Sequence, residues 1–217
     1  MSDEWIESFR ERLLIWYRAH GRSFPWRRAE APLFLRVLSE VLLQRTPAER
    51  VGGFVEAFVA RYPDWDALAE ADVEKLGEEL RPLGLWRRRA ESIRALATQV
   101  RRADGGLPRD RATLESLPGV GQYIANAIAV IAYGGAAPFL DSNMARVLER
   151  VFGPRAQVDV RYDPYLQSLA HRATAAPDSL AVNFAVLDHA AVTCTIRRPQ
   201  CGTCVVADLC RSAGTFG

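Results

Sequence analysis

The stretch Leu117-Pro118-Gly119-Val120-Gly121-Gln122-Tyr123 separates two segments whose apolar residues recur at helical spacing. Two glycines, two positions apart, allow a tight turn and let the main chain approach a ligand without a Cβ in the way. A helix that begins directly after such a turn points its unpaired N–H groups and the positive end of its dipole outward. The stretch therefore predicts a helix-hairpin-helix at about residues 111–133, in which Gly119 and Gly121 lie at a phosphate-binding turn; a plain turn between two helices is the alternative.

The rest of the chain shows the same helical periodicity. We expect helices over residues 5–20, 33–45, from 47 onward, 65–70, 73–81, 87–102, 111–117, 122–133, 142–152 and 180–193. No useful length of strand-like alternation and no internal repeat is present. Many helices joined by short connections predict an all-α fold.

Composition sets the outer limits of the interpretation. A chain of 217 residues is long enough for one sizeable globular unit or two small lobes. No apolar run approaches the ~20 residues that span a bilayer, and the N-terminal stretch starts acidic, so we expect a cytoplasmic, nucleoid-associated protein without a signal peptide. The net charge of +2 is too small to indicate a nucleic-acid partner by itself. Arginine clusters at residues 27–28, 87–89, 101–102 and 197–198 permit DNA binding without proving it.

All the cysteines lie close together near the C-terminus. They are Cys194, Cys201, Cys204 and Cys210, with the spacing C-x6-C-x2-C-x5-C. Two disulfides are not expected in a chain without an export signal. Zinc sites usually pair two short C-x2-4-C units, and only one is present here. Four thiolates from one continuous loop instead favour a [4Fe–4S] cluster over zinc. The cluster would either be structural, holding the basic residues of the loop against phosphates, or serve in redox sensing.

The hairpin, the segment Phe139-Leu140-Asp141-Ser142-Asn143 and the cysteine loop occur in a fixed order. That order resembles the helix-hairpin-helix (HhH-GPD) base-excision DNA glycosylases, the superfamily of endonuclease III and the MutY-type adenine glycosylases. The resemblance runs from about Phe24 to Cys210. It implies two lobes: a six-helix barrel over residues 24–133, and an iron–sulfur lobe made of residues 1–23 and 134–217 with its cluster loop at 194–210.

The same resemblance implies catalytic residues. The family's catalytic aspartate corresponds to Asp141, which could equally serve as a helix N-cap. Bifunctional members carry a lysine at the position of Tyr123, whose amine attacks the sugar and then cleaves the strand. Tyrosine cannot form a Schiff base, and Lys75, the only lysine in the chain, is far away in sequence. We therefore expect a monofunctional glycosylase that leaves an abasic site.

Further residues are implied as contacts to the base and to DNA. Glu40 matches a glutamate that hydrogen-bonds or protonates the departing base, although alone it would suggest a solvated helix edge. Gln44 would fill the gap left by the flipped nucleotide, and Leu85 would insert beside its estranged partner. Core packing is the alternative for Leu85. The expected DNA-binding residues are Gln44, Arg45, Leu85, Gly119, Gly121 and Phe184.

The sequence also bears on which base is excised. The MutY-type enzymes carry a serine-like residue where Tyr123 stands, an adenine-contacting glutamine where Phe184 stands, and usually a further C-terminal domain, whereas this sequence continues for only seven residues after Cys210. Tyr123, Asp141 and Glu40 look more like the thymine-DNA mismatch glycosylases called Mig. Thymine or uracil opposite guanine is therefore favoured over adenine as the excised base. We expect the substrate to be double-stranded DNA and the protein to act as a monomer. The alternative of another class is a non-catalytic iron–sulfur DNA-binding module.

Overall fold

A computed structural model describes residues 2–103 and 105–215, and within these ranges every regular element is a helix. The α-helices are α1 (Asp3–His20), α2 (Leu33–Leu42), α3 (Ala48–Arg61), α4 (Trp65–Glu70), α5 (Val73–Leu80), α6 (Trp86–Arg102), α7 (Arg111–Ser116), α8 (Gln122–Tyr133), α9 (Ser142–Phe152), α10 (Pro164–Thr174) and α11 (Ser179–Val192). Short 3-10 turns lie at Pro25–Arg27 (η1), Arg81–Leu83 (η2), Cys201–Thr203 (η3) and Ala207–Leu209 (η4). The all-α prediction is confirmed.

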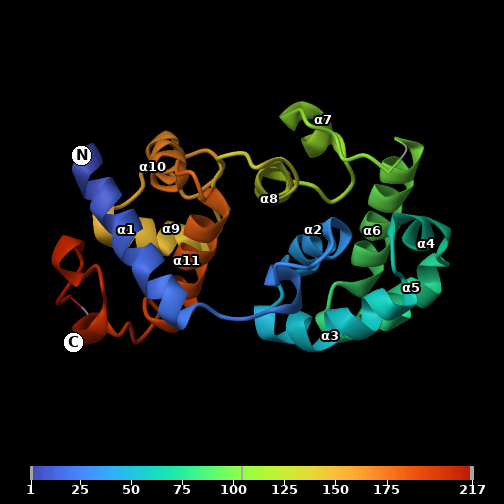
Figure 1. The fold of residues 1–217 in the computed structure, drawn as a ribbon, viewed down its shortest axis with the longest axis horizontal. Coiled ribbons are helices and arrows are strands. Elements are labelled where there is room, and N and C mark those ends of the chain that lie inside the picture. Colours follow the sequence, from blue (N-terminus) through green and yellow to red (C-terminus); the bar gives the residue numbers. More distant parts are fainter. Residues whose placement is uncertain (1, 104, 216–217) are drawn as a thin grey trace. The chain divides into compact units, whose positions relative to one another are not determined.

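The chain forms two compact units, which are described separately. Residues 23–133 make the central unit, and residues 1–22 with 134–217 make the terminal unit. The terminal unit thus takes its helices from both ends of the chain, as the blue and the yellow-to-red ribbons show (Figure 1).

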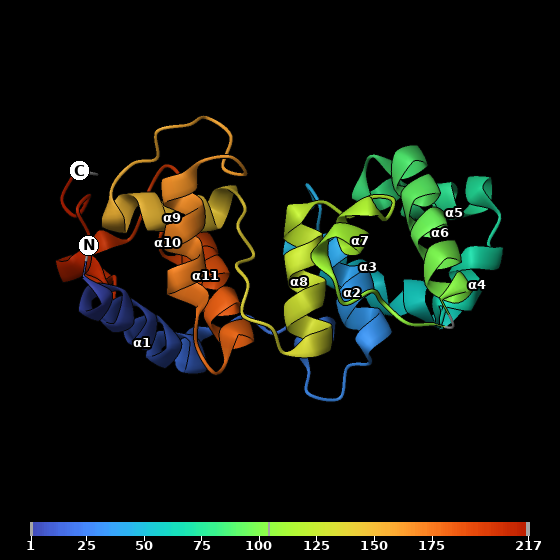
Figure 2. The ribbon, with the colours of Figure 1, turned by 90° about the horizontal axis from the view of Figure 1, so that it is seen from above.

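The central unit is built on the long helix α6 and on the pair α2 and α8. Helices α4 and α5 both pack against α6, and α2 packs against α8 (Figures 1 and 2). The α6 residues Ile93 and Leu96 and the α2 residues Leu38 and Leu42 are all buried. One continuous apolar core therefore supports both the hairpin and the end of α2.

The terminal unit closes over α11, against which α1, α9 and α10 all pack. Helix α1 buries its apolar stripe of Ile6, Phe9 and Leu13. The fully buried ring of Phe152, at the end of α9, contacts Phe9 edge-on, with their ring centroids 5.1 Å apart. The N-terminal helix is therefore an integral part of the unit that carries the cysteine loop.

The structure corrects two predicted elements. Helix α2 ends at Leu42 rather than at residue 45, because the chain turns over residues 43–45 and Arg45 takes the left-handed φ of 55°. Helix α10 was not predicted from the sequence. Its start has the expected signal, because Asp163 accepts a hydrogen bond from Leu166 N as the N-cap and Pro164 occupies the first helical position.

Other predicted bounds differ from the observed ones by at most two residues at an end, as helix assignments commonly do. Across the described ranges, we find no helix whose length and apolarity would let it cross a membrane.

Candidate active site and iron–sulfur centre

The hairpin turn between α7 and α8 requires a glycine at residue 119. Gly119 has φ 76°, and a Cβ at this residue would lie 3.0 Å from the Cβ of Ser92 on α6. Gly121 has no such constraint, since a Cβ there would meet nothing within 4 Å. Gly119 is thus required by the fold, whereas the backbone at Gly121 is open to a ligand at the start of α8.

The turn after α2 is joined to this hairpin. The Gln44 amide nitrogen Nε2 donates a hydrogen bond of 2.9 Å to the carbonyl oxygen of Gly119. Both Gln44 and Arg45 are exposed. The structure therefore brings together three of the residues that the sequence assigned to DNA binding.

Leu85 lies on a second turn of the central unit. Its side chain is 56% exposed, and its backbone is left-handed with φ 51°, directly after Gly84 at φ 73°. A leucine in this conformation is strained, because its Cβ approaches the following carbonyl. The core-packing alternative for Leu85 is therefore wrong: the turn holds an apolar side chain in solvent.

Glu40 and Tyr123, which the sequence assigned separately to catalysis, are in contact. The Tyr123 hydroxyl donates to Glu40 Oε2 at 3.1 Å, between the packed helices α8 and α2. Glu40 is only 2% exposed, so the alternative of a solvated helix edge is wrong. A carboxyl group kept from water among apolar residues needs such a partner.

Asp141 occupies the N-cap of α9. Its Oδ1 accepts hydrogen bonds from the backbone N–H groups of Asn143 and Met144, at 2.9 and 2.8 Å. Its Oδ2 accepts from the Asn143 side-chain amide at 2.8 Å. The carboxylate is half-buried and held in one orientation by three donors. The capping alternative is thus correct, and it leaves a fixed, partly accessible carboxylate for chemistry.

A buried asparagine fixes the segment that leads into Asp141. Asn183 on α11 is fully buried, accepts a 2.6 Å hydrogen bond from Phe139 N and donates one of 3.0 Å to Ala137 O. Its neighbour Phe184 is 7% exposed and packs edge-on against the ring of Phe139. Phe184 therefore packs in the core of this structure, which favours packing over its predicted role as a DNA contact.

Arg146 on α9 connects the Asp141 cap to the start of the cysteine loop. Its Nη1 donates to Asn143 Oδ1 at 3.1 Å, and its Nε donates to Cys194 O at 2.9 Å. Burial lowers the pKa of the Arg146 guanidinium from its usual high value, and the nearby Cys194 opposes that shift. Arg146 and Asn183 were not expected here from the sequence, because single polar residues inside helical patterns carry no distinguishing signal. Asn143 was expected only as part of the segment around Asp141.

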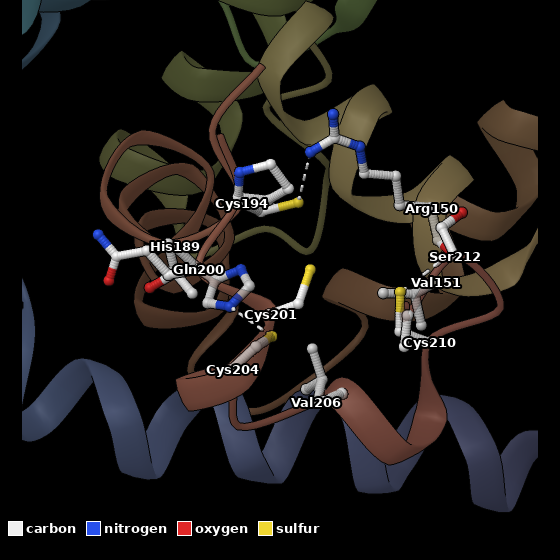
Figure 3. A pocket seen from close by; sticks show the side chains of 14 residues that line it. Arg150, Val151, His189, Cys194, Gln200, Cys201, Cys204, Val206, Cys210 and Ser212 are labelled. Carbon is white, nitrogen blue, oxygen red and sulfur yellow. Dashed lines mark hydrogen bonds between the residues drawn. The ribbon is translucent and has the colours of Figure 1, made fainter. Parts of the chain in front are cut away.

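The four cysteines line one cavity of the terminal unit, between α9, α11 and the C-terminal loop (Figure 3). The Cys194 Sγ accepts from Arg150 Nη1 at 3.4 Å, and Cys204 Sγ lies 3.4 Å from His189 Nε2. Burial lowers the pKa of His189 to about 4, so its imidazole is neutral at neutral pH. Apolar residues such as Val151 complete the lining.

This cavity fits an iron–sulfur cluster by its donor set. Burial raises the pKa values of the Cys204 and Cys210 thiols, so these sulfurs become thiolates at neutral pH only with a compensating charge such as iron. The four sulfurs line the walls of a shared cavity, where Cys194, Cys201, Cys204 and Cys210 would hold the cluster.

Comparison with known proteins places the chain in a family. Residues 38–171 match the model of the HhH-GPD superfamily of base excision DNA repair proteins, and residues 194–210 match the iron–sulfur binding domain of endonuclease III. The chain therefore belongs to the HhH-GPD superfamily and carries its iron–sulfur domain. The predicted class, a base-excision DNA glycosylase with an iron–sulfur cofactor, is confirmed.

Individual relatives are similar over nearly the whole chain. The thymine-DNA glycosylase of Aeropyrum pernix is 39% identical, over 94% of each chain, and the thymine/uracil-DNA glycosylase of Pyrobaculum aerophilum is 38% identical, over 92% of this chain and 89% of its own. The human adenine DNA glycosylase is 34% identical over 95% of this chain but 40% of its own. A solved thermostable thymine-DNA glycosylase superposes with a TM-score of 0.89 at 27% identity, over 98% of each chain.

Replacing Cys204 by Ser should remove a soft thiolate ligand and abolish cluster binding. We expect the purified variant to lose the visible absorbance and the iron content of the wild type. Ser212→Ala, in the lining of the same cavity, is the matched control and should keep both. Full iron content in Cys204→Ser, or zinc in place of iron in the wild type, would contradict the assignment.

Proposed function

We propose that the protein is a monofunctional DNA glycosylase that hydrolyses the N-glycosidic bond of thymine or uracil opposite guanine in double-stranded DNA and leaves an abasic site. The hydrogen-bonded pair of Tyr123 and Glu40 carries the proposal. In this pair, a tyrosine stands where bifunctional members have lysine, and it contacts a buried carboxyl group. The thymine and thymine/uracil enzymes among the relatives support the choice of base.

Asp141 supplies the charge that the reaction needs. Breaking the bond between base and sugar leaves positive charge at C1′, and a fixed carboxylate stabilises it without reorganising in the transition state. The three donors that hold Asp141 are part of α9 itself, so the carboxylate keeps its orientation throughout the reaction. The same group orients or deprotonates the attacking water.

Glu40 and Tyr123 act on the departing base. Their contact gives Glu40 a hydrogen-bond donor inside an apolar setting, so the pair presents a hydroxyl and a carboxyl group to the polar edge of a pyrimidine. Hydrogen bonding or protonation there lowers the negative charge that the leaving base must carry. The phenol cannot attack C1′ and form the Schiff base from which strand cleavage starts.

The central unit supplies the proposed DNA contacts. Gly119 and Gly121 grip a phosphate at the start of α8, as a helix N-terminus favours. Gln44 and Leu85 enter the duplex when the nucleotide is flipped out, and the exposure of both side chains supports this role. In this proposal the central unit is the barrel lobe, the terminal unit is the iron–sulfur lobe, and one chain acts as a monomer.

A set of matched duplexes tests the activity. We expect the wild type to release the base from U:G and T:G duplexes faster than from A:G or A:8-oxoguanine, with strand breaks appearing only after alkali. Borohydride should trap no covalent complex, because Tyr123 has no amine and Lys75 is exposed on α5. Preferred release of adenine would support the second candidate, to which the human relative points. Borohydride trapping would refute the monofunctional assignment.

Replacing Asp141 by Asn removes the charge while keeping a good helix cap. We expect single-turnover base release to fall on the order of 10²–10⁴-fold, with little change in duplex affinity. Asp64→Asn, at the N-cap of α4, is the control for the fold and should keep full activity. Unchanged base release by Asp141→Asn would disprove the catalytic role, and its loss together with DNA binding would indicate a structural one.

Replacing Tyr123 by Phe removes the hydroxyl group that donates a hydrogen bond to Glu40 Oε2. Because a hydrogen bond to a charged or polarised partner is lost, we expect the maximal single-turnover rate to fall roughly ten- to a hundredfold. Tyr162→Phe, at an exposed tyrosine, is the matched control. A rate equal to that of the wild type would show that the pair has no part in base departure.

A further inference from the structure

Arg89 on α6 is a buried cation that the catalytic proposal does not use. It is 6% exposed, and its guanidinium donates to Leu42 O at 3.0 Å, Gln44 O at 2.9 Å and Thr46 Oγ1 at 3.0 Å. The acceptors lie at the end of α2 and on the turn that follows it, more than forty positions earlier in the chain. One planar side chain thus joins the last residue of α2, the backbone of Gln44 and the side chain of Thr46.

The same residue reaches the turn of Leu85. Its backbone N–H donates to Leu85 O at 3.0 Å and so closes the first turn of α6. Thr46 Oγ1, an acceptor of Arg89, lies 3.2 Å from Leu83 O. The Arg89 side chain therefore bonds the turn that presents Gln44 directly, and it is linked to the turn that presents Leu85 through the hydroxyl group of Thr46.

Both turns are strained in the same way. Among the described residues, Arg45 and Leu85 are the two non-glycine residues with positive φ, at 55° and 51°. Each lies on one of the turns that Arg89 holds. Conformations of this kind persist only where surrounding contacts impose them, and they gather at sites that must be presented in a fixed geometry.

The chemistry of Arg89 indicates positioning rather than ion pairing. Its three side-chain acceptors are two carbonyl oxygens and a hydroxyl, with no carboxylate among them. Burial lowers the pKa of the guanidinium, as expected for a charge taken out of water. Five N–H donors in a rigid fork nevertheless suit several backbone acceptors at once, and a cation suits the negative end of α2.

We propose that Arg89 is a positioning residue that presets Gln44 and Leu85 to enter the duplex together, and so sets the free-energy cost of flipping the nucleotide. The inference rests on the proposed wedge roles of these two side chains. Gln44 Nε2 also bonds Gly119 O, so the turn that Arg89 holds is joined to the hairpin as well.

The test compares two substrates that differ in the cost of flipping. Uracil opposite guanine must be unpaired and unstacked, whereas uracil opposite an abasic-site analogue has no partner to leave. Arg89→Gln should lower single-turnover release at U:G tenfold or more and release opposite the abasic analogue less than threefold. Arg89→Lys keeps the charge and some donors and should restore part of the U:G rate. Arg94→Gln, at an exposed arginine of α6, is the matched control.

Equal losses on both substrates, or no loss at U:G, would overturn the proposal. Thr46→Val serves if Arg89→Gln fails to fold, because it removes one acceptor of Arg89 and the contact to Leu83. It should show the same substrate dependence.

A second readout separates this inference from the proposed function. In the Asp141→Asn background, 2-aminopurine beside the target nucleotide reports unstacking by fluorescence, and Arg89→Gln should abolish the increase. If the wild type releases neither thymine nor uracil, the proposed function fails, while the fluorescence still tests Arg89. An unchanged increase in Arg89→Gln would disprove its positioning role.

Discussion

Hydrogen bonds from buried side chains to loop backbone hold the proposed functional residues in place. Asn183 fixes the segment before Asp141, and Arg89 fixes the turn of Gln44. Loop backbone near a core has N–H and C=O groups that neither a helix nor water satisfies, so a side chain from a neighbouring helix must do so. The same bond then gives the loop one position, as precise as the helix that supplies it.

Each of the proposed functional groups lies at or next to the end of a helix. Asp141 caps α9, Tyr123 lies in the first turn of α8, Leu85 directly precedes α6, and Gln44 follows α2. Helix ends leave backbone groups without partners inside the helix, which makes them suited to hold a carboxylate or a phosphate. They also combine a rigid support with exposure, as a site for a large and flexible substrate needs.

The cysteine loop solves a different problem. Between Val192 and residue 215, the last that the structure describes, the regular elements are the short 3-10 turns η3 and η4. Arg150 bonds both the Cys194 sulfur and the carbonyl oxygens of Thr195 and Ile196. The far end of the loop is bonded to α9 as well, through Arg211 N to Val151 O at 3.2 Å and Ser212 N to Arg150 O at 3.0 Å. A cluster held by Cys194, Cys201, Cys204 and Cys210 would cross-link this loop to itself, since all four ligands follow the end of α11.

The sequence by itself determined the helical class, the hairpin and the cysteine loop, because periodicity, glycine spacing and cysteine spacing are local properties. It also contains the signal for the start of α10, an N-cap aspartate followed by a proline. Only the tertiary structure decided that Leu85 is exposed, that Glu40 and Phe184 are buried, and that Arg89 joins two turns. Burial and long-range hydrogen bonds depend on which helices pack together, and no local pattern specifies that.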